Sequence, residues 1–215
     1  MPSTVVHLAL AGLIAAGLLG DAFSTRSLAM VLAVVAFVDF DVFVGLVVPG
    51  AHRAAFHTLL IPLVATGFLV YDTRVRDRSL LRARYGPDAP RIVGVTLVAV
   101  VFAAIGLDLF TTGVNVFYPL HDQFYRVNGK LLVSNHKGFV QTYVHFDGGT
   151  VQATTLGSTH QVHIDSGVDP TRGPDPKHAR RVFPFAQSGW QLLLVLTSLA
   201  VVGGRLRETD REAAE

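Results

Sequence analysis

The sequence predicts a membrane α-helical bundle of about five transmembrane helices, with a small external antiparallel β insertion between the last two helices. Two bulk properties indicate a membrane protein. Half of the 215 residues are hydrophobic and only 16% are charged, whereas an average soluble domain carries about 25% charged residues. The third observation is that the apolar residues form five separate stretches near the length that a bilayer requires, which is about 20 residues.

These five stretches cover residues 5–19, 28–48, 56–71, 92–116 and 190–203. We expect the first to be a retained helix rather than a signal peptide, because the four residues before it contain no Lys or Arg. The predicted organisation is therefore a four-helix transmembrane bundle over residues 1–116 and an external β-rich insertion over 117–188. A fifth transmembrane helix follows over 189–204, and a cytoplasmic tail over 205–215.

The placement of arginine predicts the orientation of these helices. Short cytoplasmic loops are enriched in Lys and Arg, and six arginines lie in the loop over residues 72–91, with three more in the C-terminal tail. We therefore expect this loop and the C-terminus to be cytoplasmic, and the N-terminus and the β insertion to be external, in a multi-pass protein of the cell membrane. The net charge of only +2 offers no support for nucleic acid binding, so the expected partner is the lipid bilayer.

The polar segment before the fifth stretch reads as a set of short strands. Residues 124–127, 130–134, 138–146, 150–156 and 160–166 are rich in β-branched and aromatic residues. Asp147-Gly148-Gly149 lies between two of these runs, which is a hairpin signal. We therefore predict a small antiparallel β unit here.

Ionisable side chains interrupt four of the apolar stretches. Each costs about 2.5–3.5 kcal/mol to insert into a bilayer, so such residues are retained where they pair or take part in chemistry. The predicted topology brings all of them to the external half of the membrane, which indicates one shared site. Asp39 and Asp41 lie about 200° apart on an ideal helix, so they share a site only if the helix is broken there or if two metals lie side by side.

The chemistry of this set favours a metal. The chain has no cysteine, which excludes disulfides, thiolate zinc sites and iron–sulfur clusters. Imidazoles and carboxylates suit a divalent metal, with zinc favoured. We expect Asp39 to act as a general base and Arg53 to hold an anionic group of the substrate. The candidate metal ligands are His7, Asp41, His52, His57 and Asp108.

At these positions the sequence resembles the YdjM-type family of inner-membrane metal-dependent hydrolases. The resemblance covers residues 1–120 and rests on short motifs, of which the HRxxxHT element from His52 to Thr58 is the most specific. The other motifs are an N-terminal His at His7, a DxD at Asp39 and Asp41, and a DxxT beginning at Asp108. The resemblance implies a membrane-embedded hydrolase and suggests kinship with zinc-dependent phospholipases.

Three functions are compatible with these residues. The first is a membrane-embedded, metal-dependent hydrolase with its site in the outer leaflet, acting on a lipid or a phosphoester. The second is a non-enzymatic membrane protein, in which the buried His/Asp network is structural and the external β unit binds a partner. The third is an ion transporter, which the scarcity of charged residues near the predicted cytoplasmic ends of the spans disfavours.

Overall fold

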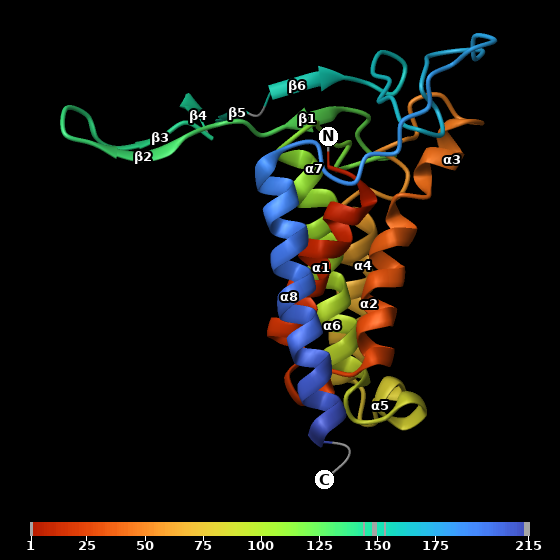
Figure 1. The fold of residues 1–215 in the computed structure, drawn as a ribbon, viewed down its shortest axis with the longest axis vertical. Coiled ribbons are helices and arrows are strands. Elements are labelled where there is room, and N and C mark those ends of the chain that lie inside the picture. The colour runs from red at the N-terminus through yellow and green to blue at the C-terminus, as the bar shows by residue number, and fades with distance from the viewer. Residues whose placement is uncertain (1, 144, 148–149, 153, 213–215) are drawn as a thin grey trace.

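The computed structural model describes residues 2–143, 145–147, 150–152 and 154–212. Its long helices stand side by side in a bundle, and the strands and most of the irregular loops lie across one end of that bundle (Figure 1). The short helix α5 (Leu80–Tyr85) lies at the opposite end (Figure 1). The N-terminus is at the strand-bearing end, which we call the β end, and the C-terminus is at the α5 end.

Helix α1 (Thr4–Leu18) packs against α2 (Thr25–Val38), α8 (Gly189–Glu212), and α6 (Ala89–Ala99) with the π-helix that continues α6. Small residues permit this close packing, as is common between membrane helices. Ala11 and Ala15 are fully buried in the core. At Gly12, a Cβ atom would lie 3.1 Å from the Ser198 hydroxyl oxygen, so α1 and α8 approach closely at this point.

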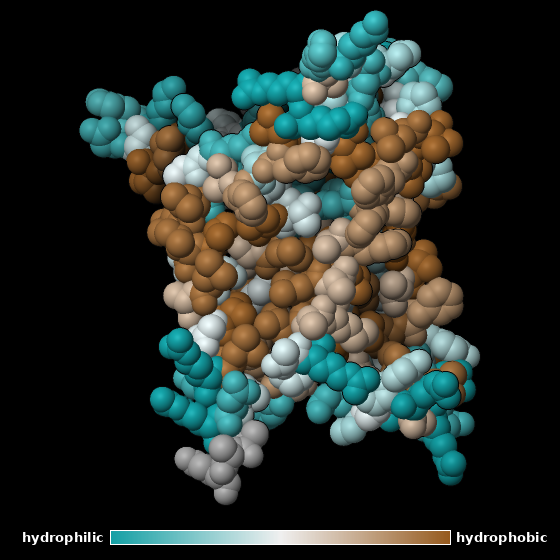
Figure 2. Space-filling view, turned by 45° about the vertical axis from the view of Figure 1, so that its right-hand side comes forward, coloured by the Kyte–Doolittle hydropathy of each residue, from teal (hydrophilic) through white to brown (hydrophobic). Residues whose placement is uncertain are grey.

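Within the described residues, three helical segments are long and apolar enough to cross a membrane, namely Thr25–Gly45, Ala89–Leu109 and Gly189–Arg211. Helix α1 is apolar but shorter, with 15 residues. Figure 2 shows a hydrophobic band across the middle of the molecule, with hydrophilic residues gathered at both ends. The structure thus confirms a helix-rich fold with membrane-length helices.

Two of the expected helices are interrupted near their ends at the β end. The second apolar stretch forms α2 and then α3 (Asp41–Gly45), with Asp39 and Phe40 between them in a turn. The fourth stretch forms α6, the π-helix η3 (Val100–Gly106) and α7 (Leu107–Leu109). It ends before residue 116, the predicted end, because the Asp108 carbonyl accepts hydrogen bonds from the amides of three following residues, the last being Gly113 at φ +109°.

The other helices also differ from prediction at their boundaries. The third stretch is helical only from Leu60, where α4 (Leu60–Val70) begins, and it continues into the π-helix η2 (Tyr71–Val75). The 3-10 helix η1 (Gly20–Ala22) connects α1 and α2. Helix α8 extends through residues 205–212 of the predicted tail, where Arg205 pairs with Glu208 and the Thr209 hydroxyl donates to the Arg205 carbonyl.

The segment between α7 and α8 contains three two-stranded antiparallel ladders, which confirms the predicted small antiparallel unit. In the first ladder β1 (Phe124–Arg126) pairs with β6 (Thr154–Gly157). In the second, β2 (Leu131–Ser134) pairs with β3 (Gly138–Gln141). In the third, β4 (His145–Asp147) pairs with β5 (Thr150–Gln152). The last ladder flanks the predicted Asp-Gly-Gly turn, although residues 148–149 themselves are outside the described residues.

One predicted strand is wrong. Residues 160–166 form a turn and an irregular segment rather than a strand. The reason is that their polar backbone groups find partners outside any ladder. The carbonyl oxygen of Ile164 lies 2.8 Å from Nδ1 of His52, and the Ser158 carbonyl accepts from the amides of Gln161 and Val162.

Candidate metal centre

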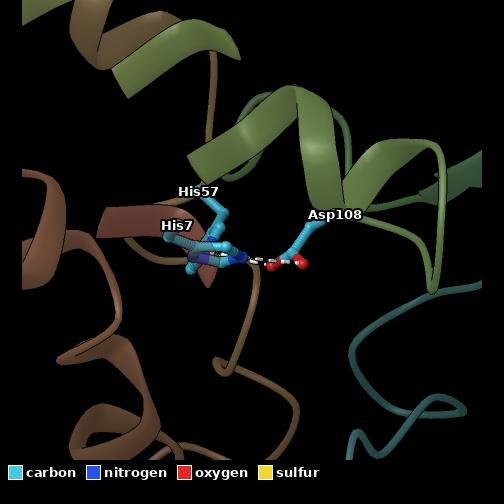
Figure 3. A group of neighbouring side chains, drawn as sticks. All are labelled: His7, His57 and Asp108. Carbon is cyan, nitrogen blue, oxygen red and sulfur yellow. Dashed lines mark hydrogen bonds and ion pairs between the residues drawn. The ribbon is translucent and has the colours of Figure 1, made fainter. Parts of the chain in front are cut away.

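Polar residues from four parts of the chain meet inside the bundle at its β end. His7 comes from the first turn of α1, and Asp108 comes from α7. Asp39 lies in the turn between α2 and α3, Asp41 begins α3, and the loop between α3 and α4 supplies Arg53 and His57. His7, His57 and Asp108 each offer one ligand atom, and these atoms all lie within 4.8 Å of one another (Figure 3).

The break in the helix explains how Asp39 and Asp41 reach the same site. An uninterrupted α-helix would direct them to nearly opposite sides. Because residues 39 and 40 form a turn instead, both carboxylates approach His57. Oδ1 of Asp39 lies 3.5 Å from His57 Nε2, and Oδ2 of Asp41 lies 2.7 Å from His57 Nδ1. Of the two arrangements that the sequence left open, the structure adopts the broken helix.

Each imidazole makes one hydrogen bond with a carboxylate. His57 Nδ1 bonds to Asp41, and His7 Nε2 bonds to Oδ1 of Asp108 at 3.2 Å. A carboxylate oxygen only accepts hydrogen bonds, so the bonded nitrogen of each ring carries the proton. In the neutral rings, Nδ1 of His7 and Nε2 of His57 therefore present lone pairs. Within the described part of the chain, neither of these two buried nitrogens has a hydrogen-bond partner.

Both bare nitrogens nevertheless face carboxylate oxygens. His7 Nδ1 is 3.2 Å from Oδ1 of Asp39, and His57 Nε2 is 3.4 Å from Oδ2 of Asp108. Two lone pairs facing each other repel unless a proton or a metal cation lies between them. In a tetrahedral site with ligands about 2.0–2.1 Å from the ion, neighbouring ligand atoms are about 3.3–3.4 Å apart. The spacing of these donors therefore fits a small divalent ion.

The negative charge of the centre also has to be neutralised. Three carboxylates and one guanidinium leave two uncompensated negative charges when both imidazoles are neutral. The side chains of Asp41 and Asp108 are fully buried, where uncompensated charge is costly. Either one divalent cation or protonation of both imidazoles would neutralise the centre. Protonation would let the two bare nitrogens donate to the carboxylates that they face, whereas a metal cation would bind their lone pairs directly.

Arg53 is the largest fully buried side chain of the described residues and is 2% exposed. Its Nε lies 3.0 Å from Oδ2 of Asp108. Its backbone is in the left-handed region at φ +61°, a conformation that non-glycine residues adopt at an energetic cost and that is often found at functional sites. Two hydrogen bonds maintain this backbone: the amide donates to Asp41, and the carbonyl accepts from the amide of Asn115.

A pocket of about 460 Å³ reaches the centre from the surface. His7, Asp39 and Arg53 form part of its polar lining. Asp39 has the only carboxylate of the three whose side chain is partly exposed, at 21%. Its second oxygen accepts a hydrogen bond from the Thr4 hydroxyl. Asp39 is therefore the carboxylate that can exchange a proton with water in the pocket.

The structure places His52 beside this cluster. Its Nδ1 forms a hydrogen bond with the Ile164 carbonyl. This bond connects the α3–α4 loop to the segment after β6. Burial lowers the pKa of the His52 imidazole below its ordinary value, which favours the neutral ring. The candidate ligands that the structure brings together are His7, His57 and Asp108. Asp39 contacts both imidazoles, and Asp41 contacts only that of His57.

Sequence reasoning missed two polar residues that support the centre. Thr4 binds Asp39, and Asn115 holds the Arg53 carbonyl. Asn115 is fully buried and stands between two valines in an apolar run, a pattern that could have indicated its role. The N-terminal Thr4 gave no such signal, because a Thr before an apolar helix is common.

The fold and the centre together define a helix-rich protein with membrane-length helices and a buried His/Asp cluster able to hold a metal ion. Comparisons with protein-family models, with curated proteins and with solved structures find no match to this chain.

Proposed function

We propose that this protein is a membrane-embedded, metal-dependent hydrolase whose centre binds one divalent cation, with zinc favoured. The observation that carries the proposal is the pair of buried imidazole nitrogens that lack hydrogen bonds and face carboxylate oxygens at ligand-to-ligand spacing. His7, His57 and Asp108 would hold the ion, with Asp39 at the edge of the site. A bound divalent cation supplies Lewis acidity and makes a coordinated water acidic enough to serve as a nucleophile near neutral pH.

The protein groups around the ion divide the remaining tasks. Asp39 is the carboxylate open to the pocket, and it accepts the proton of the attacking water as general base. Arg53 lines the same pocket, where its fixed positive charge binds an anionic group such as a phosphoryl oxygen. Asp41 holds the tautomer and orientation of His57, as carboxylates commonly do for metal-binding histidines.

The first experiment measures metal content and melting temperature, with and without a strong chelator. An ion present at 1,000 times its dissociation constant stabilises the folded state by about 4 kcal/mol. We therefore expect the chelator to lower the melting temperature by roughly 10 °C, and Asp108→Asn to lose both the metal and the response. Asp72→Asn is the matched control, since Asp72 binds Ser79 and Leu80 outside the centre.

The second experiment separates catalysis from metal binding. Asp39→Asn should keep at least part of the metal but lower phosphoester turnover by about 10²–10⁴-fold, the usual contribution of a general base. The main alternative is a purely structural network, in which both imidazoles are protonated. In that case the wild-type protein contains no metal and melts at the same temperature with and without chelator, and the hydrolase proposal fails.

We also propose that the chain crosses the membrane five times, with α1 and α4 as short partners of the three membrane-length helices. The arginine-rich loop over residues 72–91 and the C-terminus then lie in the cytoplasm, and the β insertion lies outside. The absence of cysteine makes this testable with an impermeant thiol reagent on intact cells. We expect Ser134→Cys to be labelled and Arg78→Cys to be protected, and the reverse pattern would invert the topology.

A further inference from the structure

The pocket that leads to the centre has apolar walls from two distant segments. Phe40 and Phe43 come from the region of the α2–α3 break, and Phe183 and Phe185 come from the segment before α8. All four rings are exposed, between 49% and 76%. Exposing this much aromatic surface to water is energetically unfavourable, and covering it with a lipid chain removes that cost.

The position of the pocket along the bundle indicates where it opens. Asp39, Phe40 and Phe43 belong to the last third of the membrane-length segment Thr25–Gly45. The pocket therefore lies at the end of a membrane span, at the depth where lipid headgroups meet the first carbons of their chains. Its volume of about 460 Å³ falls within the usual range of small-molecule sites, about 300–1,000 Å³.

Arg53, which lines the polar end of the pocket, has an unused hydrogen-bond donor. Only 2% of the surface of Arg53 is exposed. Within the described residues its Nη1 atom has no hydrogen-bond partner. A buried guanidinium with an unpartnered N–H binds an anionic oxygen strongly, and its planar geometry suits phosphate.

We infer that the pocket binds a membrane-resident phosphate ester, with the phosphoryl group on Arg53 and an apolar chain along the four phenylalanines. The apolar chain of the ligand then extends sideways from the pocket into the bilayer. The substrate therefore enters the pocket without first leaving the membrane. This inference rests on the proposed function and specifies its substrate class. A free phosphate ester shares the headgroup chemistry but has no apolar chain to cover the aromatic walls.

The test uses phosphatidic acid with a photoactivatable diazirine in one acyl chain, added to the metal-loaded protein in detergent micelles. We expect crosslinks at residues 40–43 and 182–185. Unlabelled phosphatidic acid should compete at least about tenfold better than glycerol 3-phosphate or diacylglycerol, since each of these lacks one half of the ligand. Equal competition by glycerol 3-phosphate would identify a soluble phosphate ester instead and overturn the inference.

Matched variants distinguish the pocket from the general lipid-facing surface. Phe183→Ala should reduce specific crosslinking by about tenfold, whereas Phe68→Ala should leave it unchanged, because Phe68 is equally exposed but outside the pocket. Phe43→Ala provides a second pocket variant if the first does not fold. Crosslinks spread over all apolar helix faces, with no loss in either pocket variant, would overturn the inference.

The outcomes also separate this inference from the proposed function. A protein that contains metal and hydrolyses phosphoesters, but shows only diffuse crosslinking, retains the proposed function and loses the lipid pocket. A protein without metal that still gives specific, competable crosslinks retains the lipid pocket and loses the hydrolase assignment.

Discussion

His57 and Asp41 form the shortest contact between an imidazole and a carboxylate in the centre, with 2.7 Å between Nδ1 and Oδ2. The same carboxylate oxygen accepts hydrogen bonds from the backbone amides of Arg53 and Phe56. One buried carboxylate thus fixes both the orientation of the His57 ring and the path of the loop that carries it. Asp41 has this role because the helix break at residues 39–40 directs it inward.

The first prediction concerns Asp41→Asn. Removing the negative charge weakens the hold on the His57 tautomer without removing a proposed ligand, so metal affinity should fall by about 10–100-fold. At saturating metal the variant should still bind one ion. Chelator competition measures the affinity, with Asp72→Asn as the control of the same chemical change. An unchanged affinity in Asp41→Asn would show that His57 does not contact the ion.

The second prediction concerns the buried pair of Arg53 and Asp108. Arg53→Met should destabilise the fold by about 3–5 kcal/mol, because it leaves a buried charge uncompensated. In the presence of chelator, where no variant gains stability from a metal, adding Asp108→Asn should recover part of that loss. The expected coupling energy is about 1–3 kcal/mol, obtained from denaturant unfolding of the two single variants and the double variant.

The exposed pair of Arg205 and Glu208, 3.4 Å apart on α8, is the matched control for this cycle. Exposed pairs of this kind couple by about 0.3–0.5 kcal/mol. A buried pair that couples no more strongly than this surface pair would contradict the electrostatic account of the centre.

The third prediction concerns Gly50. Its φ is +74°, and a Cβ atom there would lie 2.1 Å from the Thr159 carbonyl oxygen. Gly50→Ala should therefore destabilise the protein by about 2–4 kcal/mol through a strained backbone and a clash with the insertion. Gly67→Ala is the control, since it lies in α4 with nothing within 4 Å, and it should melt at the wild-type temperature or above. Equal melting of both variants would refute the tight contact.

The fourth prediction concerns pH and Asp122. Burial tends to raise the pKa of this carboxyl group, but hydrogen bonds from Thr159 and Asn115, together with the nearby His160, lower it below its ordinary value. A carboxyl group with a lowered folded-state pKa contributes stability above its unfolded pKa, which is about 3.9. That stability is lost as the pH falls below about 4 toward the folded-state pKa.

Melting curves of wild type and Asp122→Asn between pH 3 and pH 7, endpoints chosen to be about one unit below and three above the unfolded pKa, measure this effect. The difference in melting temperature should be largest at neutral pH and should shrink toward pH 3. A difference that stays constant over the whole range would show that the ionised form of Asp122 gains nothing in the folded state.

The sequence predicted the helical class well because the thickness of the bilayer sets the length of each apolar stretch. Of the five predicted ligands, the structure brings His7, His57 and Asp108 into one possible metal group; His and Asp are conspicuous among apolar neighbours. The break between α2 and α3 could not be chosen over a two-metal site, because Asp39-Phe40-Asp41 carries no Pro or Gly to mark it. In the structure, the turn coincides with contacts that the two aspartates make with His7 and His57.

The walls of the pocket were not predictable by the same reasoning. Phe183 and Phe185 lie in a polar loop, and their approach to α3 depends on long-range contacts that no local pattern encodes. The same holds for residues 160–166, where alternation of residue types suggested a strand. Their hydrogen bonds go to partners such as His52, more than 100 positions away in the chain.

His52 and Ile164 bind each other although they are far apart in the sequence, so they are synthesised at different times. All candidate ligands precede residue 109, whereas Ile164, which binds His52 beside the centre, and Phe183, which lines the pocket, come later. At ordinary rates of synthesis, this interval of roughly fifty residues takes several seconds. During this time the ligands are made but these later residues are not, so an ion can enter directly from water. The metal that we propose for this centre can therefore be loaded before the pocket walls are complete.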